Sequence, residues 1–216
     1  MTPALLLALK LRELDFVAID LETTGLDARR DVPVAVAAIP FIAGAPRADA
    51  GYATLVNPGR PIPAETQLIH GITDADVNAA PHIAAALPPF LEVCRQRPIV
   101  AHSAGFDLTI VNRAAKAAGL APLEGPVLDI GALAHGLFPS WWDLSLEGLA
   151  RLNEVEPLGR HTADGDALAA GRIFLRLIPR LEQQGVRTLA DAVRFQRRTP
   201  LLPGGPGATG GGLTGP

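Results

Sequence analysis

The sequence Phe-Val-Ala-Ile-Asp-Leu-Glu-Thr-Thr-Gly-Leu at residues 16–26 predicts the first strand of a buried sheet. Its first seven residues form an apolar run that ends in acids, a pattern typical of a strand buried on both faces. Because side chains alternate along a strand, Asp20 and Glu22 share a face with Phe16 and Ala18. Two neighbouring carboxylates repel each other and resist burial, so a positive group is expected beside them. Taken alone, the pair fits a strand end that reaches solvent, but the turn that follows it favours a site.

The segments after this strand predict an α/β domain. Further strands are expected at 32–43 and 51–56, after which Asn57-Pro58-Gly59 supplies a turn. Hydrophobic periodicity predicts strands at 98–102 and 127–130 and helices at 64–70, 82–96, 105–119, 145–153, 163–184 and 188–198. Pro88 and Pro89 predict a kink in one of these helices, or two short helices. The order of elements indicates a mixed central sheet flanked by helices.

The composition excludes several classes of protein. A hydrophobic fraction of 48% excludes a fully disordered chain. A net charge of −3 argues against a protein that coats duplex DNA or RNA by charge, but it allows an enzyme that holds a strand end with the help of bound cations. The single cysteine, Cys94, excludes an intrachain disulfide and favours a reducing, cytoplasmic setting. The apolar run at 5–9 is too short to cross a membrane and has no basic segment before it, so no membrane association is expected.

The end of the chain differs from the rest. Gly and Pro dominate residues 199–216, and no apolar periodicity is present there. We predict a flexible Gly/Pro-rich tail over 199–216 and one folded domain over 1–198. The motifs described below lie in a core of this domain at about residues 15–180.

Asp107 opens the helix expected at 105–119. Ile110 and Val111 lie on the same side of that helix, so the acid is expected to point along its core-facing side. An outward-facing acid that the helix dipole favours is the alternative.

Asp166 repeats this pattern in the helix expected at 163–184. Ala170 and Phe174 lie on its side at i+4 and i+8, so the acid heads an apolar stripe and is expected to face the sheet. His161 precedes Asp166 by five residues, on the loop that leads into the helix. A lone histidine is more often a structural or surface residue, but its offset from an inward-facing acid favours a role in a site.

Together, Asp20, Glu22, Asp107 and Asp166 predict a metal site. Inward-facing carboxylates with no cysteine and few histidines favour a hard cation bound through oxygen, Mg²⁺ or Mn²⁺, over zinc. Two such ions about 4 Å apart can stabilise the attacking and leaving oxygens of a phosphodiester displacement. A nearby neutral histidine can take the proton of the attacking water, because its pKa lies close to working pH.

Three motifs carry a resemblance to a known family. They are Ile-Asp-Leu-Glu-Thr-Thr-Gly-Leu at 19–26, Ala-His-Ser-Ala-Gly-Phe-Asp at 101–107 and His-Thr-Ala-Asp-Gly-Asp-Ala at 161–167. On these motifs the chain resembles the DEDDh 3'–5' exonucleases, the group of the proofreading epsilon subunit of bacterial DNA polymerase III, ribonuclease T and oligoribonuclease. The His-x4-Asp spacing is that of the histidine branch. Each motif alone is weak, but three in order on the expected elements are strong evidence.

The resemblance implies an RNase H-like fold and a 3'–5' exonuclease that acts on single-stranded DNA or RNA with two divalent metal ions, Mg²⁺ or Mn²⁺. It implies that Asp20 bridges the two ions, that Glu22 and Asp166 help to hold one of them and Asp107 the other, and that His161 is the general base. The residues that it implies around the terminal nucleotide are Thr23, Thr24, Leu26, His70, Ser103 and Phe106.

The sequence departs from the family pattern in two places. Ser103 stands where the family usually has Asn, and its shorter side chain puts a substrate or loop contact in doubt. The segment 32–36 lacks an acid often seen there. Neither departure removes a metal ligand or the base, so activity is still expected. Asp129, in an apolar strand, is expected to cap or turn the chain rather than to support the site.

Several functions stay open. Proofreading of DNA ends, processing of RNA ends and degradation of short oligonucleotides all fit the resemblance, and the first requires a DNA polymerase partner. No recognisable polymerase-binding segment is present in the tail. A non-catalytic nucleic-acid or polymerase-binding module of the same fold is one alternative, and a phosphohydrolase of nucleotides or small phosphates is another. The enzyme ranks first because the expected acids and the histidine are all present. The oligomeric state is not predicted.

Overall fold

The structure, a computed structural model, describes residues 2–95, 97–156, 159 and 161–198. Its centre is a sheet with the strand order β3-β2-β1-β5-β6, in which β4 also pairs with β2. The strands are β1 (Phe16–Thr23), β2 (Pro33–Ile42), β3 (Ala45–Pro46), β4 (Tyr52–Leu55), β5 (Ile99–Ala101) and β6 (Val127–Asp129). β1 runs antiparallel to β2 and parallel to β5, which in turn runs parallel to β6. The predicted α/β class with a mixed sheet is therefore confirmed. The tail predicted at 199–216 lies outside the described residues.

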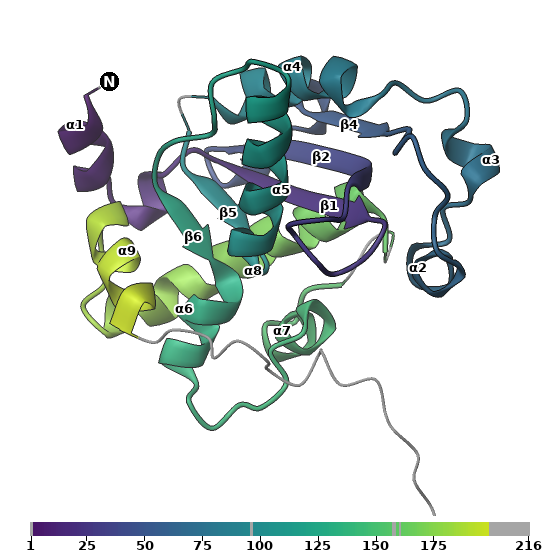
Figure 1. The fold of residues 1–216 in the computed structure, drawn as a ribbon. Coiled ribbons are helices and arrows are strands. Elements are labelled where there is room, and N and C mark those ends of the chain that lie inside the picture. The colour runs from purple at the N-terminus through teal and green to yellow at the C-terminus, as the bar shows by residue number, and fades with distance from the viewer. Residues whose placement is uncertain (1, 96, 157–158, 160, 199–216) are drawn as a thin grey trace, which may run out of the picture.

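Helices cover both faces of this sheet. They are α1 (Pro3–Ala8), α2 (Ala64–His70), α3 (Asp74–Val77), α4 (Ile83–Cys94), α5 (Ala104–Ala117), α6 (Ile130–Leu137), α7 (Leu146–Leu152), α8 (Ala163–Gln183) and α9 (Leu189–Arg198). Figure 1 shows α4 and α5 on one side of the sheet and the long helix α8 on the other. None of the helices in the described part of the chain combines the length and apolarity that a bilayer crossing requires.

The alternation of side chains along β1 divides the core between these two sides. Phe16 and Ala18 belong to the cluster that contains the buried face of α8, whereas Val17 and Ile19 belong to the cluster under α4 and α5. Burying a large apolar side chain stabilises the fold by roughly 1.5–3 kcal/mol. β1 is therefore fixed in register, because a slip by one residue would bring Asp20 and Glu22 to the face of α4 and α5.

Close packing holds α8 against the sheet. The Phe16 ring stacks on Phe41 of β2 with centroids 4.8 Å apart, and it meets Phe174 of α8 edge-on at 5.0 Å. A Cβ atom at Gly171 of α8 would collide with the Phe41 ring. The missing side chain thus lets the helix approach β2 closely.

The three parallel strands end at one edge of the sheet. α5 follows β5, and α6 begins directly after β6, so both helices start at this edge. Asp20 and Glu22 lie near the end of β1 at the same edge. Ligand sites in open α/β sheets form outside the carboxyl ends of strands, and the predicted site residues lie there.

Candidate metal centre and active site

The carboxylates on β1 sit where the strand leaves the core. Asp20 and Glu22 are half-buried, while Leu21 between them is buried against the opposite face. The β1–β2 register becomes irregular between Glu22 and Thr23. Such irregularities end regular pairing and re-aim side chains, and they are common beside active sites.

A third acid comes from the first turn of α8. Thr162 caps this helix, since its hydroxyl accepts a hydrogen bond from the Gly165 N–H at 3.2 Å. Asp166 follows on the side that packs against the sheet. One carboxylate oxygen each of Asp20, Glu22 and Asp166 lies within 4.8 Å of the others, so the sheet and α8 bring these three together.

Asp107 approaches the group from α5 but stands apart from it. Its side chain is buried, and its Oδ2 atom has no hydrogen-bond partner among the described residues. The three-acid group does not include it, yet its charge acts on Asp20. The inward orientation predicted for Asp107 is therefore correct.

The four acids repel one another in a poorly solvated place. Burial, followed by the charges of Asp107, Asp166 and Glu22, holds the pKa of Asp20 well above its usual range. Burial and the charge of Asp166 raise the pKa of Glu22 to about 7. Burial also raises the pKa of Asp166, although His161 opposes this shift.

Among the described residues, no arginine or lysine pairs with these acids, and only His161 and His102 oppose the pKa shift of Asp166. The ion pairs among the described residues involve none of the four acids. An uncompensated group of buried carboxylates is costly unless a cation joins it. Oxygen ligands of this kind suit Mg²⁺ or Mn²⁺.

His161 lies on the loop before α8 in a left-handed backbone conformation. For a residue other than glycine this conformation is strained, and such strain is found most often at functional sites. Its Nε2 atom is 3.9 Å from a carboxylate oxygen of Glu147 on α7. Glu147 could not be predicted from the sequence, because its place beside His161 depends on how α7 packs against the loop.

The residues expected around the terminal nucleotide differ in exposure. Leu26 is 78% exposed, whereas Thr23 and Thr24 are buried. The Thr24 hydroxyl donates to Asp31 at 2.9 Å and accepts from Arg60 at 2.7 Å, so it holds the turn together. The Thr23 hydroxyl donates to a backbone carbonyl two residues on.

Three further residues complete that set. Burial lowers the pKa of His70, whose Nδ1 atom accepts the Ile72 N–H at 3.0 Å. Ser103 is exposed and left-handed at the start of α5, and its hydroxyl makes no capping bond. Phe106, a residue of α5, is half-buried and packs against the core.

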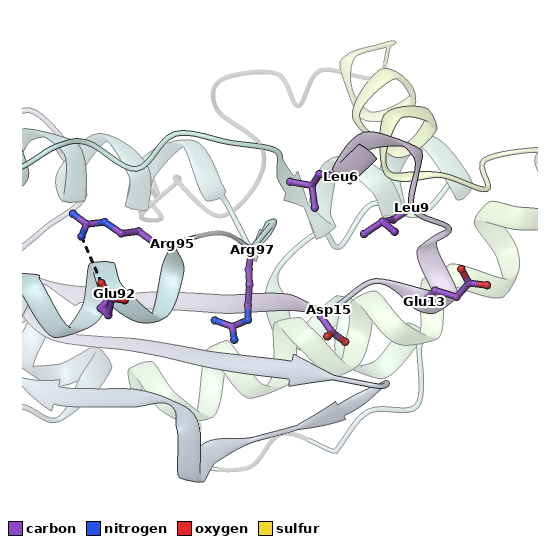
Figure 2. Close-up of a pocket in the computed structure, with 7 residues that line it drawn as sticks. All are labelled: Leu6, Leu9, Glu13, Asp15, Glu92, Arg95 and Arg97. Carbon is purple, nitrogen blue, oxygen red and sulfur yellow. Dashed lines mark ion pairs between the residues drawn. The ribbon is translucent and has the colours of Figure 1, made fainter. Parts of the chain in front are cut away.

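One cavity of the structure lies away from these acids. Figure 2 shows it beyond the other end of β1, where Asp15 precedes the strand, with an ion pair between Glu92 and Arg95 in its wall. Its volume is about 410 Å³, and its lining is Leu6, Leu9, Glu13, Asp15, Glu92, Arg95 and Arg97. None of the predicted site residues lines it.

Fold and site together define the class. The central strand of a mixed sheet carries paired acids, and Asp166 of α8 lies beside them. The chain belongs to the RNase T exonuclease family, whose model matches residues 17–174. This match confirms the resemblance drawn from the three motifs.

Individual relatives agree with this assignment. A DNA polymerase III subunit epsilon-like protein of Rhodobacter capsulatus is 41% identical over 191 residues, which are 87% of this chain and 27% of that protein. A PolC-type DNA polymerase III of Caldanaerobacter subterraneus is 34% identical over 177 residues, which are 82% of this chain and 12% of that protein. The chain thus spans only a small part of the length of these curated relatives.

Solved structures show the same fold. Exonuclease X in complex with 5'-overhanging duplex DNA is 25% identical with a TM-score of 0.64, and the match covers 84% of this chain and 99% of that one. Exonuclease I of E. coli in complex with a dT13 oligonucleotide is 19% identical with a TM-score of 0.68, and the match covers 80% of this chain and 42% of that one. The predicted RNase H-like fold is confirmed.

Proposed function

We propose that the chain is a metal-dependent 3'–5' exonuclease that hydrolyses phosphodiester bonds at the 3' end of single-stranded DNA or RNA. The observation that carries this proposal is the convergence of Asp20, Glu22 and Asp166 within 4.8 Å in a chain of the exonuclease family. A binding module that had lost its chemistry would have no reason to keep mutually repelling acids at this place.

The residues fit two divalent cations. Their donors are all carboxylate oxygens, and Asp107 Oδ2 lacks any described partner. Burial, and then repulsion that positive charge would relieve, raises the pKa values of Asp20 and Glu22. Asp20, Glu22 and Asp166 would hold one cation, while Asp107 together with Asp20 would hold the other. When bound, Mg²⁺ or Mn²⁺ supplies positive charge to the phosphate oxygens as negative charge develops on them.

The chain's own residues would carry the proton and position the strand. His161, partly exposed beside Asp166, accepts the proton of the attacking water, and Glu147 stabilises the imidazolium that results. The exposed side chain of Leu26 contacts the terminal nucleotide, and the bonded Thr24 hydroxyl keeps the turn that carries it in shape.

We also propose a biological process and a partner for this activity. The names of the two relatives refer to DNA polymerase III, and the two solved structures were determined with DNA. These names favour removal of nucleotides from DNA ends, in proofreading or repair, with a DNA polymerase as partner. Co-purification of the chain with a polymerase catalytic subunit from its own source tests the partner separately.

Hydrolysis of labelled oligomers tests the activity. The protein is incubated with single-stranded DNA and with RNA of the same sequence, with Mg²⁺, with Mn²⁺ and with EDTA. Asp20→Ala serves as the inactive variant, and Asp164→Ala serves as the matched control, because Asp164 is an exposed acid two residues from Asp166 on α8. We expect shortening that needs the metal and Asp20 but not Asp164. Equal shortening by wild type and Asp20→Ala would contradict the proposal.

A further inference from the structure

Asp129 at the end of β6 bonds the starts of two helices at once. Its Oδ1 atom accepts the N–H groups of Gly131 at 2.9 Å and Ala132 at 3.1 Å, which caps α6 as expected from the sequence. Its Oδ2 atom accepts the Ala104 N–H of α5 at 2.9 Å. A carboxylate at the positive ends of two helix dipoles is itself well stabilised.

The second of these bonds fixes the helix that carries Asp107. Ala104 is the first residue of α5, and Asp107 lies three residues further on. No described donor bonds Asp107 Oδ2, so the place of this carboxylate depends on where α5 begins. Burial, followed by the charge of Asp129, holds the pKa of Asp107 well above its usual range.

A side chain of α9 in turn fixes Asp129. β6 is the last strand of the sheet, and the Gln196 amide bonds its free edge as a further strand would. Gln196 Oε1 accepts the Asp129 N–H at 2.9 Å, and Gln196 Nε2 donates to the Val127 carbonyl at 2.7 Å. α9 lies beyond residues 17–174, which the family model matches.

We propose that Asp129 is a positioning residue for Asp107, and that Gln196 of α9 holds Asp129 in place. The hydrogen bonds run from α9 through the edge of β6 to the start of α5, and they end one helical turn before the Asp107 carboxylate. The inference rests on the proposed function, because it assigns Asp107 to a metal ion. It predicts that metal affinity depends on residues that touch no metal.

Asp129→Asn separates this role from helix capping. Asn is as good an N-cap as Asp, and its Oδ1 can still accept the N–H groups of α6. Its amide nitrogen, however, meets the Ala104 N–H with a second donor, so the bond to α5 is lost together with the negative charge of Asp129. Asn112→Ala is the matched control, because it removes two side-chain bonds from α5 to Leu123 at the other end of the same helix.

The test measures the affinity for Mn²⁺ in the absence of substrate, by electron paramagnetic resonance titration. The proteins compared are wild type, Asp129→Asn, Asn112→Ala, Asp107→Ala and the double variant Asp107→Ala/Asp129→Asn. We expect Asp129→Asn to weaken Mn²⁺ binding by about tenfold, the size usual for residues that orient metal ligands. We expect Asn112→Ala to bind as wild type does. In the Asp107→Ala background, Asp129→Asn should have no further effect, because it acts through Asp107.

Two results would overturn the inference: Asp129→Asn binding Mn²⁺ as tightly as wild type, or its full effect persisting without Asp107. If Asp129→Asn does not fold, Gln196→Ala carries the same test, with a loss in the same direction that also vanishes without Asp107. Oligomer hydrolysis by the same variants keeps the two proposals apart. If Asp129→Asn weakens Mn²⁺ binding through Asp107 but the wild type hydrolyses no oligomer, only the proposed function is contradicted. If the wild type hydrolyses oligomers but Asp129→Asn has no effect on Mn²⁺ binding that depends on Asp107, only the positioning role is contradicted.

Discussion

At the scale of single residues, the folded chain buries the acids of the site close together, which disfavours their ionised forms. Burial and mutual repulsion raise the pKa values of Asp20, Glu22, Asp107 and Asp166. The place of each acid is nonetheless fixed by ordinary structure, namely strand alternation on β1 and the first turns of α5 and α8. Keeping these acids together therefore lowers the stability of the fold.

Glu22 makes this cost dependent on pH. Its pKa is 4.5 in an unfolded chain and about 7 in the folded one. Between these values the folded state binds more protons at Glu22, so the contribution of Glu22 to metal-free stability is full below the first value and is lost as pH rises through the second. Thermal unfolding in EDTA should show Glu22→Gln gaining on wild type as pH rises through this window. A difference in melting temperature that stays constant with pH would contradict the shift.

The left-handed backbone at Ser103 is strained, and an Asn side chain at this position would relieve part of the strain. A left-handed residue other than glycine costs roughly 1–2 kcal/mol, and Asn tolerates this conformation better than Ser. We expect Ser103→Asn to raise the free energy of unfolding by up to about 1 kcal/mol, measured by urea denaturation. Ser103→Ala is the control and should change little, because the Ser103 hydroxyl makes no capping bond. A lower midpoint for Ser103→Asn would show that the strain is not relieved.

Part of the site could be predicted from the sequence, and part of it could not. Alternation along β1 and the apolar stripe behind Asp166 predicted the three acids that converge. The distance of Asp107 from them could not be predicted, since it depends on how α5 is seated beside β1. The second bond of Asp129, and Glu147 beside His161, arise from tertiary packing and leave no periodic signal.

At the scale of elements, most helices and strands were predicted near their observed positions, including the short helix at 64–70, but two helices were missed. α3 was not predicted, because it spans only Asp74–Val77. α6 was not predicted either, because the apolar run of β6 continues into it and only the cap at Asp129 marks the change. α4 remains one helix through Pro88 and Pro89, since its buried residues Leu87 and Phe90 hold it on the sheet.

The close approach of α8 to β2 makes Gly171 sensitive to substitution. A methyl group there would meet the Phe41 ring, so Gly171→Ala should lower the free energy of unfolding by about 1–3 kcal/mol. Gly105 of α5 is the matched control, because nothing lies within 4 Å of a Cβ built there. Gly105→Ala should raise stability by up to about 1 kcal/mol, as expected in a helix. Chemical denaturation measures both, and equal effects would contradict the packing described for α8.

At the scale of the whole molecule, bound cations should stabilise the fold and the acids should destabilise it without them. A ligand at 100 times its dissociation constant adds about 2.7 kcal/mol to stability. We therefore expect Mn²⁺ to raise the melting temperature of wild type. Asp20→Asn should melt higher than wild type in EDTA, because repulsion is relieved, and should respond less to Mn²⁺. A melting temperature of Asp20→Asn below that of wild type in EDTA would contradict this account.

The domain boundaries remain predictions from the sequence. One domain over 1–198 and a tail over 199–216 are consistent with a family match at 17–174. The helix α9, beyond this match, packs near α1 and α6 and supports β6. In the described part of the chain, Gln196 of α9 thus bonds the outer edge of β6.

The direction of hydrolysis is the most direct test of the central claim. One single-stranded DNA oligomer is labelled at its 5' end and, in a second preparation, at its 3' end, and both are followed with Mg²⁺ by denaturing gel. The account predicts a ladder of shortening products from the 5'-labelled strand and immediate release of a labelled mononucleotide from the 3'-labelled one, with neither in Asp20→Ala. A ladder from the 3'-labelled strand, or no hydrolysis of either with any divalent metal, would contradict it.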